Sequence, residues 1–107
     1  MTRTREFRKT VRDYTQSNSK FRIAIFTEAV NELLAGELDT GKAMLRDYVN
    51  ATITFEGLSH KTGIPVMSLQ RGLGPRGNPT AENLLTIISI LQKEEQITLS
   101  VKSKNAA

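Results

Sequence analysis

The sequence predicts a small all-α domain of five helices followed by one short C-terminal strand. Five segments carry apolar residues three and four positions apart, which is the period of a helix with one buried face. Capping residues, glycine or proline separate these segments. Only residues 96–101, QITLSV, alternate apolar and polar side chains as a strand does. A chain of 107 residues has the usual size of a single compact domain.

The first two predicted helices each have one apolar face. Residues 20–35 form the first helix, with Ser19 as its N-cap and Gly36 at its end, where the left-handed conformation is common. Its expected buried residues are Phe26, Val30, Leu33 and Leu34. Asp39 or Thr40 is expected to cap the second helix. The expected buried residues of that helix are Ala43, Met44, Tyr48 and Val49.

The remaining three helices follow from capping and stop signals. Thr54 is expected to cap the third helix, and Gly63 to end it. Pro65 suits the start of a new helix, so residues 66–73, VMSLQRGL, form a short fourth one. Thr80 is expected to cap the fifth. The apolar residues of the fifth helix are Leu84, Leu85, Ile87, Ile88 and Leu91.

The positive charge of the chain is concentrated near its N-terminus. The net charge is +4, and residues 1–22 contain seven basic and two acidic residues. We therefore expect residues 1–18 to form a basic arm, either a phosphate-binding segment or a solubilising, poorly ordered terminus. The domain itself is expected to span residues 19–102, and residues 103–107 to form a disordered tail.

Composition argues against several classes of function. The chain has no cysteine, which excludes disulfides, thiolate chemistry and zinc fingers. His60 is the only histidine, so we expect neither a metal cluster nor a Cys–His nucleophile. The acidic pair Glu28 and Glu32 is more typical of a solvated helix face than of catalysis. No apolar run is long enough to span a membrane or to act as a secretory signal. We expect a cytoplasmic protein that is not an enzyme, needs no cofactor and does not bind membranes.

Residues 72–77, GLGPRG, match the dinucleotide-binding pattern G-x-G-x-x-G. That pattern binds phosphate when a strand precedes it and a helix follows it in a parallel sheet. Here a short helix precedes the glycines, and Gly77 is not followed by the lysine of a P-loop. We interpret the segment as a loop between two helices, in which glycines supply the turns while Pro75 and Pro79 stiffen the chain.

The segment before this loop has the spacing of a DNA-binding helix-turn-helix. Within residues 54–73, two short helices are joined by a turn at Gly63. Leu58 and Leu69 face inward, and Ile64 fills the turn. A short second helix of this kind fits the major groove, where its side chains reach base edges.

At these residues the sequence resembles a known family. The run "LSHKTGIPVMSLQRGLGPRGNPTAENLLTIISIL" is similar to the Cro/phage-repressor (Xre-like) helix-turn-helix domain. More narrowly, it resembles the HigA-like antidote (antitoxin) proteins of addiction modules, which are encoded beside a RelE/HigB-type toxin. The S-L-x-R and G-N-P pieces carry this resemblance, which covers residues 29–101. It implies a compact five-helix, phage-repressor-like domain that binds operator DNA as a homodimer.

The resemblance also implies roles for individual residues. It places Pro65 at the N-cap of the recognition helix. The residues implied to read bases are Val66, Met67, Gln70 and Arg71. Of these, Arg71 can pair with guanine and Gln70 with adenine, although both could also be solvated surface residues. The residues that could contact phosphate are Thr54, Lys61, Ser68, Arg76 and Asn78. Among these, Thr54 is more typical of a cap and Asn78 of a turn.

Two hypotheses about function follow from this sequence. The first is a sequence-specific, dimeric transcriptional regulator that acts as the antidote and autorepressor of a toxin–antitoxin module. Its dimer could form through the strand at residues 97–101 or through the fifth helix. The second is a protein-interaction module that mainly binds and neutralises a toxin. Acidic residues between Glu28 and Asp47 would then meet a basic partner.

Overall fold

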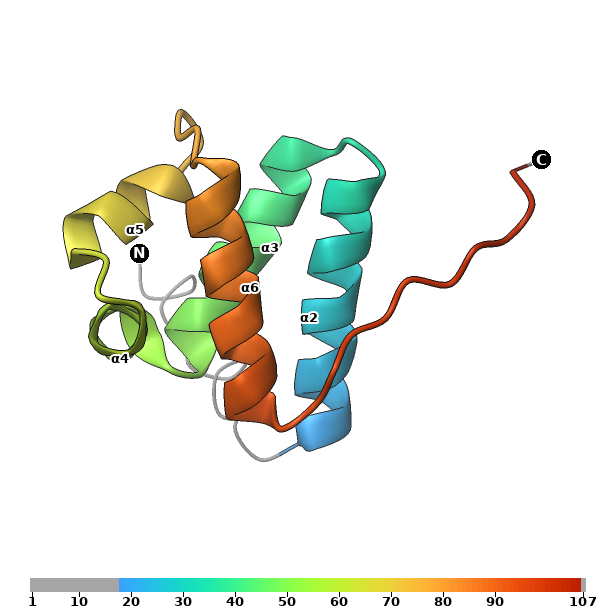
Figure 1. Ribbon diagram of the computed structural model, residues 1–107, viewed down its shortest axis with the longest axis horizontal. Coiled ribbons are helices and arrows are strands. Elements are labelled where there is room, and N and C mark those ends of the chain that lie inside the picture. Colours follow the sequence, from blue (N-terminus) through green and yellow to red (C-terminus); the bar gives the residue numbers. More distant parts are fainter. Residues whose placement is uncertain (1–17, 107) are drawn as a thin grey trace, which may run out of the picture.

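The computed structural model describes residues 18–106, and these residues fold into five helices (Figure 1). The helices are α2 (Ser19–Leu34), α3 (Leu38–Ala51), α4 (Thr54–Thr62), α5 (Val66–Gly72) and α6 (Ala81–Glu95). The prediction of an all-helical domain is therefore confirmed for this part of the chain. The predicted basic arm lies outside the described residues, except for Asn18. None of the five helices is long and apolar enough to cross a membrane.

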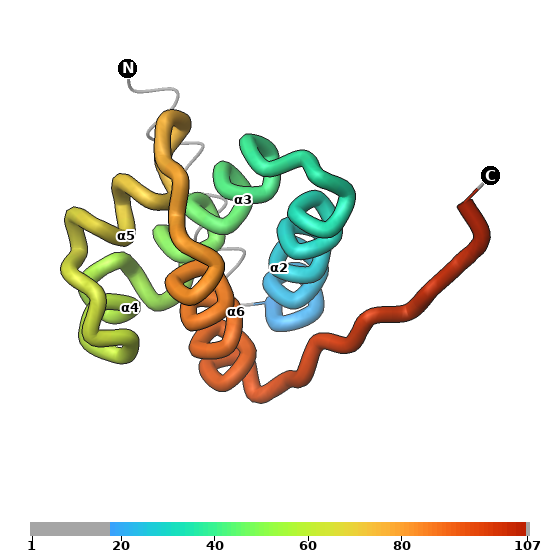
Figure 2. The backbone as a smooth tube through the Cα atoms, turned by 45° about the horizontal axis from the view of Figure 1, so that its top comes forward, coloured from blue at the N-terminus to red at the C-terminus, as the bar shows by residue number. Residues whose placement is uncertain are grey.

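The helices pack as a hairpin, a short pair and a central last helix. α2 and α3 run antiparallel side by side, and α4 and α5 form the short pair (Figure 1). α6 lies between α2 and the α4–α5 pair in both views of the backbone (Figure 2). The chain therefore leaves α5 by the loop 73–80 and returns along α6 to cover the core.

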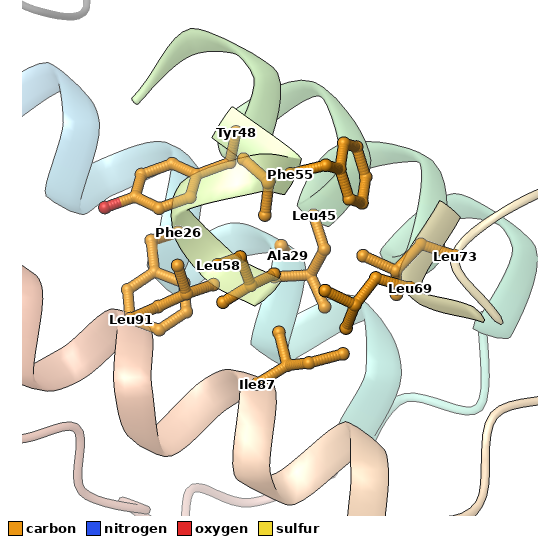
Figure 3. Close-up of a cluster of buried hydrophobic side chains, with 11 residues drawn as sticks. Phe26, Ala29, Leu45, Tyr48, Phe55, Leu58, Leu69, Leu73, Ile87 and Leu91 are labelled. Atoms are coloured by element: carbon orange, nitrogen blue, oxygen red, sulfur yellow. The ribbon is translucent and has the colours of Figure 1, made fainter. Parts of the chain in front are cut away.

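The hydrophobic core receives side chains from every described helix (Figure 3). α2 contributes Phe26, whose ring stacks on that of Tyr48 with a centroid separation of 5.2 Å. The fully or nearly fully buried members are Phe26, Ala29, Leu45, Tyr48, Val49, Phe55, Leu58, Leu69, Leu73, Ile87 and Leu91. Burying a side chain of this size contributes roughly 1.5–3 kcal/mol. This core fixes α4 and α5 as well as the longer helices, because Leu58 and Leu69 are among its members.

The predicted end of the first helix is correct, but its cap is one residue away from the expected one. Gly36 has the left-handed φ of +85° that the sequence predicted for the helix end. Asn18, and not Ser19, caps α2, because its Oδ1 accepts a hydrogen bond from the Phe21 amide at 3.1 Å. Leu34 was expected in the core, but it is the last residue of α2 and is 64% exposed.

The predicted caps of the second helix are wrong. α3 begins at Leu38 with Glu37 at the N-cap position, and no side chain caps it. Asp39 lies in the first turn instead, where its negative charge is favourable to the helix dipole. Leu45 is fully buried, whereas the expected Ala43 and Met44 are only half-buried. Tyr48 and Val49 are buried as expected, so the prediction of the buried face is correct for the second half of the helix and wrong for its first half.

The predicted C-terminal strand is absent from the described residues. Residues 97–106 have no regular secondary structure. A strand needs a neighbour for its backbone groups, and the described residues contain no strand that could pair with this one. The alternation of apolar and polar residues nevertheless predicts which side chains are partly buried. Ile97 and Leu99 pack on the core, while Thr98 and Ser100 are exposed. Val101 departs from it and is 82% exposed.

Candidate nucleic-acid interface

α4 and α5 are joined by the tight turn that the sequence predicted. Gly63 ends α4 in the left-handed conformation, with φ of +78°, and its amide donates to the Ser59 carbonyl at 2.8 Å. The Ile64 amide donates to the Thr62 hydroxyl at 3.1 Å, and the Ile64 side chain packs on the core. Pro65 then occupies the N-cap position of α5, as expected. α4 is seen nearly end-on in Figure 1, whereas α5 runs across the view.

The start of α4 is fixed by Thr54. Its hydroxyl accepts a hydrogen bond from the Gly57 amide at 3.2 Å, but Thr54 is the first residue of the helix, and Ile53 rather than Thr54 occupies the N-cap position. Thr54 has a φ of +70°, which is unusual for a β-branched residue. Gly57 leaves room for Ile53, because a β-carbon at position 57 would come within 2.8 Å of Ile53 Cγ1. The hydroxyl of Thr54 is therefore already engaged by the backbone of its own helix.

α5 exposes three of the four predicted base-reading side chains on one face. Met67, Gln70 and Arg71 are all exposed, and their spacing of three and four residues places them on the same side of a helix. Leu69 is buried on the opposite side. Val66 is set apart from the three, because it is half-buried and packs on the core.

The predicted phosphate-contacting residues lie on α4, on α5 and in the loop that follows α5. Ser68 is exposed on α5 itself, while Arg76 and Asn78 are exposed in the loop that follows it. Lys61 lies near the end of α4 with its side chain 52% exposed, and its Nζ is 3.8 Å from a carboxylate oxygen of Glu94. An exposed pair of this kind contributes little to stability and leaves the ammonium group available.

Two cationic residues that the sequence did not single out hold the loop after α5. Lys42 Nζ donates to the Gly77 carbonyl at 2.6 Å, and Arg46 Nη1 donates to the Leu73 carbonyl at 2.8 Å. Both side chains come from α3, one turn apart. No pattern in the sequence distinguishes them from solvated lysines and arginines, because their partners are backbone carbonyls that lie far along the chain.

A second polar cluster lies away from α5. A hollow of about 270 Å³ is lined by Arg22, Tyr48, Thr52, Ile53, Leu91, Glu94 and Glu95. Burial acts to raise the pKa of Glu95, but hydrogen bonds from Arg22 and Tyr48 outweigh it and leave that pKa below its ordinary value. Burial, followed by the hydrogen bond to Glu95, raises the pKa of Tyr48. Arg22 of α2 and Tyr48 of α3 thus both donate hydrogen bonds to Glu95 of α6.

Within residues 18–106, no three metal-binding side chains are grouped so that they could hold an ion. Comparisons with protein-family models, curated proteins and solved structures found no significant match.

Proposed function

We propose that this protein is a sequence-specific DNA-binding transcriptional regulator that recognises its own operator as a homodimer. The observation that carries the proposal is the exposed face of α5. Met67, Gln70 and Arg71 project from a short helix whose other side is anchored in the core. A rigid helix with an exposed polar face is what major-groove reading requires.

The chemistry of the three side chains suits base edges. The guanidinium of Arg71 matches the O6 and N7 acceptors of guanine, and the amide of Gln70 matches the N7 and N6 groups of adenine. Met67, which is 70% exposed, supplies an apolar contact for a thymine methyl group. Lys61 and Arg76 are exposed cations that precede and follow this helix in the chain, and their charge suits contacts to the phosphate backbone.

The resemblance to HigA-like antidotes extends this proposal. The operator would be the DNA upstream of the protein's own gene, and its half-sites would lie about one helical turn, ~34 Å, apart. The protein would then act as the autorepressor of a toxin–antitoxin module.

Fluorescence anisotropy with labelled upstream DNA tests this proposal. Scrambled DNA of the same composition is the control, and the salt concentration is varied. We expect tighter binding to the upstream DNA, with a preference that persists as salt rises. Equal binding to both DNAs that disappears with salt would contradict sequence reading.

A second candidate function is the neutralisation of a basic toxin by the α2–α3 end of the molecule. Partial burial raises the pKa of Glu32, and the neighbouring carboxylate of Glu28 raises it further. A cationic partner would stabilise the two carboxylates, so the acidic face of α2 that carries Glu28 and Glu32 suits a basic toxin. Leu34 and Leu38, exposed by 64% and 55%, lie at the same end and offer apolar contact. Co-purification with the product of the adjacent gene tests this function.

A further inference from the structure

The loop that follows α5 lies directly on the end of that helix. The Gly74 amide donates to the Arg71 carbonyl at 3.1 Å, and the Gly77 amide donates to the Gly74 carbonyl at 2.9 Å. A β-carbon at position 77 would collide with the carbonyl oxygens of Arg71 and Gly72. The backbone of the loop is therefore packed against the carbonyls at the end of α5, next to the proposed base-reading residues.

α3 anchors this loop at two points, Leu73 and Gly77. Lys42 donates to the carbonyl of Gly77, and Arg46 donates to the carbonyl of Leu73. The Lys42 side chain is only 9% exposed, and Asp39 Oδ1 lies 3.7 Å from its ammonium group. Among the described residues, Lys42 is the one charged residue that is buried as a whole, although the Glu95 side chain is as little exposed, at 6%.

The burial of Lys42 indicates a specific role, because a lysine is seldom buried without a partner. Removing an ammonium group from water is costly unless hydrogen bonds compensate. Here the hydrogen bond to a loop carbonyl and the nearby Asp39 carboxylate supply that compensation. α3 itself is fixed in the core by Leu45 and Val49, so the two cations connect the loop to a rigid element.

We infer that Lys42 and Arg46 are positioning residues for DNA recognition. They hold the loop so that Arg71 at the end of α5 and Arg76 in the loop keep one fixed relative placement. A base contact and a phosphate contact can then form at the same time, with the phosphate contact setting the register of the helix in the groove. This inference rests on the proposed function.

The test compares variants that remove each donor and retain the length of the side chain. K42M and R46M, singly and together, are titrated against upstream and scrambled DNA at several salt concentrations. We expect the preference for upstream DNA to fall about tenfold in the double variant, comparable to the loss of one base contact. Binding to scrambled DNA should be unchanged, because both cations donate to carbonyls of the loop. R46K, which keeps a cationic donor, should recover most of the preference.

A matched control separates positioning from general loss of stability. R22M removes a cation that binds Glu95 at the other end of α6. It should lower the thermal midpoint and leave the preference for upstream DNA at the wild-type value. An equal fall in preference in R22M would mean that stability alone explains the effect, and the inference would be overturned. Should K42M not fold, R46M provides the same comparison, since Arg46 is only half-buried.

A readout without DNA keeps the two proposals distinguishable. Hydrogen exchange of the Gly74 and Gly77 amides, followed by NMR, should accelerate about tenfold in the double variant relative to amides in α6. Unchanged exchange together with an unchanged preference would overturn the inference. If the wild-type protein showed no preference for upstream DNA, the proposed function and the positioning role would both fail, and the exchange data would still decide whether α3 anchors the loop.

Discussion

Arg22 and Glu95 are 73 residues apart and join the first turn of α2 to the last turn of α6. Arg22 Nε and Nη2 donate to the two carboxylate oxygens of Glu95 at 2.8 and 3.1 Å. The hydroxyl of Tyr48, from α3, donates to the same carboxylate. One carboxylate thus connects three helices, and it closes the bundle at the end remote from the loop 73–79.

Glu95→Gln should destabilise the fold by about 2 kcal/mol, because Arg22 and Tyr48 would lose their hydrogen bonds to a charged carboxylate. The pKa of Glu95 is below its ordinary value of 4.5 in the folded protein. Its contribution to stability is therefore complete above that value and is lost as the pH falls through the lower folded-state pKa. Urea unfolding of both proteins between pH 7 and pH 3 measures this. If the Glu95→Gln variant lost stability with falling pH as steeply as the wild-type protein, carboxylates other than Glu95 would cause the acid dependence.

Gly77→Ala should be more disruptive than Gly36→Ala. A β-carbon at position 77 would overlap the carbonyls of Arg71 and Gly72, whereas nothing lies within 4 Å of one at position 36. The first substitution must displace the loop, at a cost of about 2–3 kcal/mol. The second costs about 1 kcal/mol through its positive φ. Urea denaturation of the two variants compares these values, and equal destabilisation would contradict the tight packing of the loop.

The sequence predicts a helix boundary well where the boundary has a local cause, whereas the start of α3, which no side chain caps, is predicted wrongly. Gly36 and Gly63 take left-handed conformations at helix ends, as their residue type favours. The apolar period of residues 81–95 likewise predicts a helix whose inner side is buried. Local signals of this kind act within a few residues, so a single sequence contains them.

Features that depend on distant parts of the chain are harder to predict. The buried role of Lys42 depends on a carbonyl 35 residues further on, and the Arg22–Glu95 pair spans most of the chain. The alternation at residues 97–101 predicts a strand, yet it cannot tell whether a second strand lies nearby. For the candidate interface, spacing alone predicts which α5 residues share a face, but the separate position of Val66 depends on tertiary packing.

Deleting residues 100–107 should convert the proposed dimer into a monomer and leave the fold intact. Within the described residues, Leu99 is the last whose amide has a hydrogen-bond partner, the side chain of Gln92 at 2.8 Å. An extended segment with free backbone groups can pair with its symmetry mate. Light scattering measures the mass, and circular dichroism checks that the helices persist.

A truncated protein that is still dimeric would exclude residues 100–107 as the interface. The alternative interface is α6, on which Leu85 is 63% exposed. Leu85→Glu in the full-length chain should then produce the monomer. The two variants together assign the dimer contact to one element.

Arg71→Ala should weaken operator binding by about 1–3 kcal/mol and relax specificity at a single base pair, because one bidentate contact with guanine is lost. Arg76→Ala is the matched comparison, since Arg76 is an exposed arginine in the adjacent loop. Its loss should weaken binding to all sequences alike and reduce the slope of log K against log salt by about 1. Anisotropy with a panel of single-base operator variants distinguishes the two patterns. If Arg71→Ala weakened every sequence equally, Arg71 would be a phosphate contact, and base reading would rest on Met67 and Gln70.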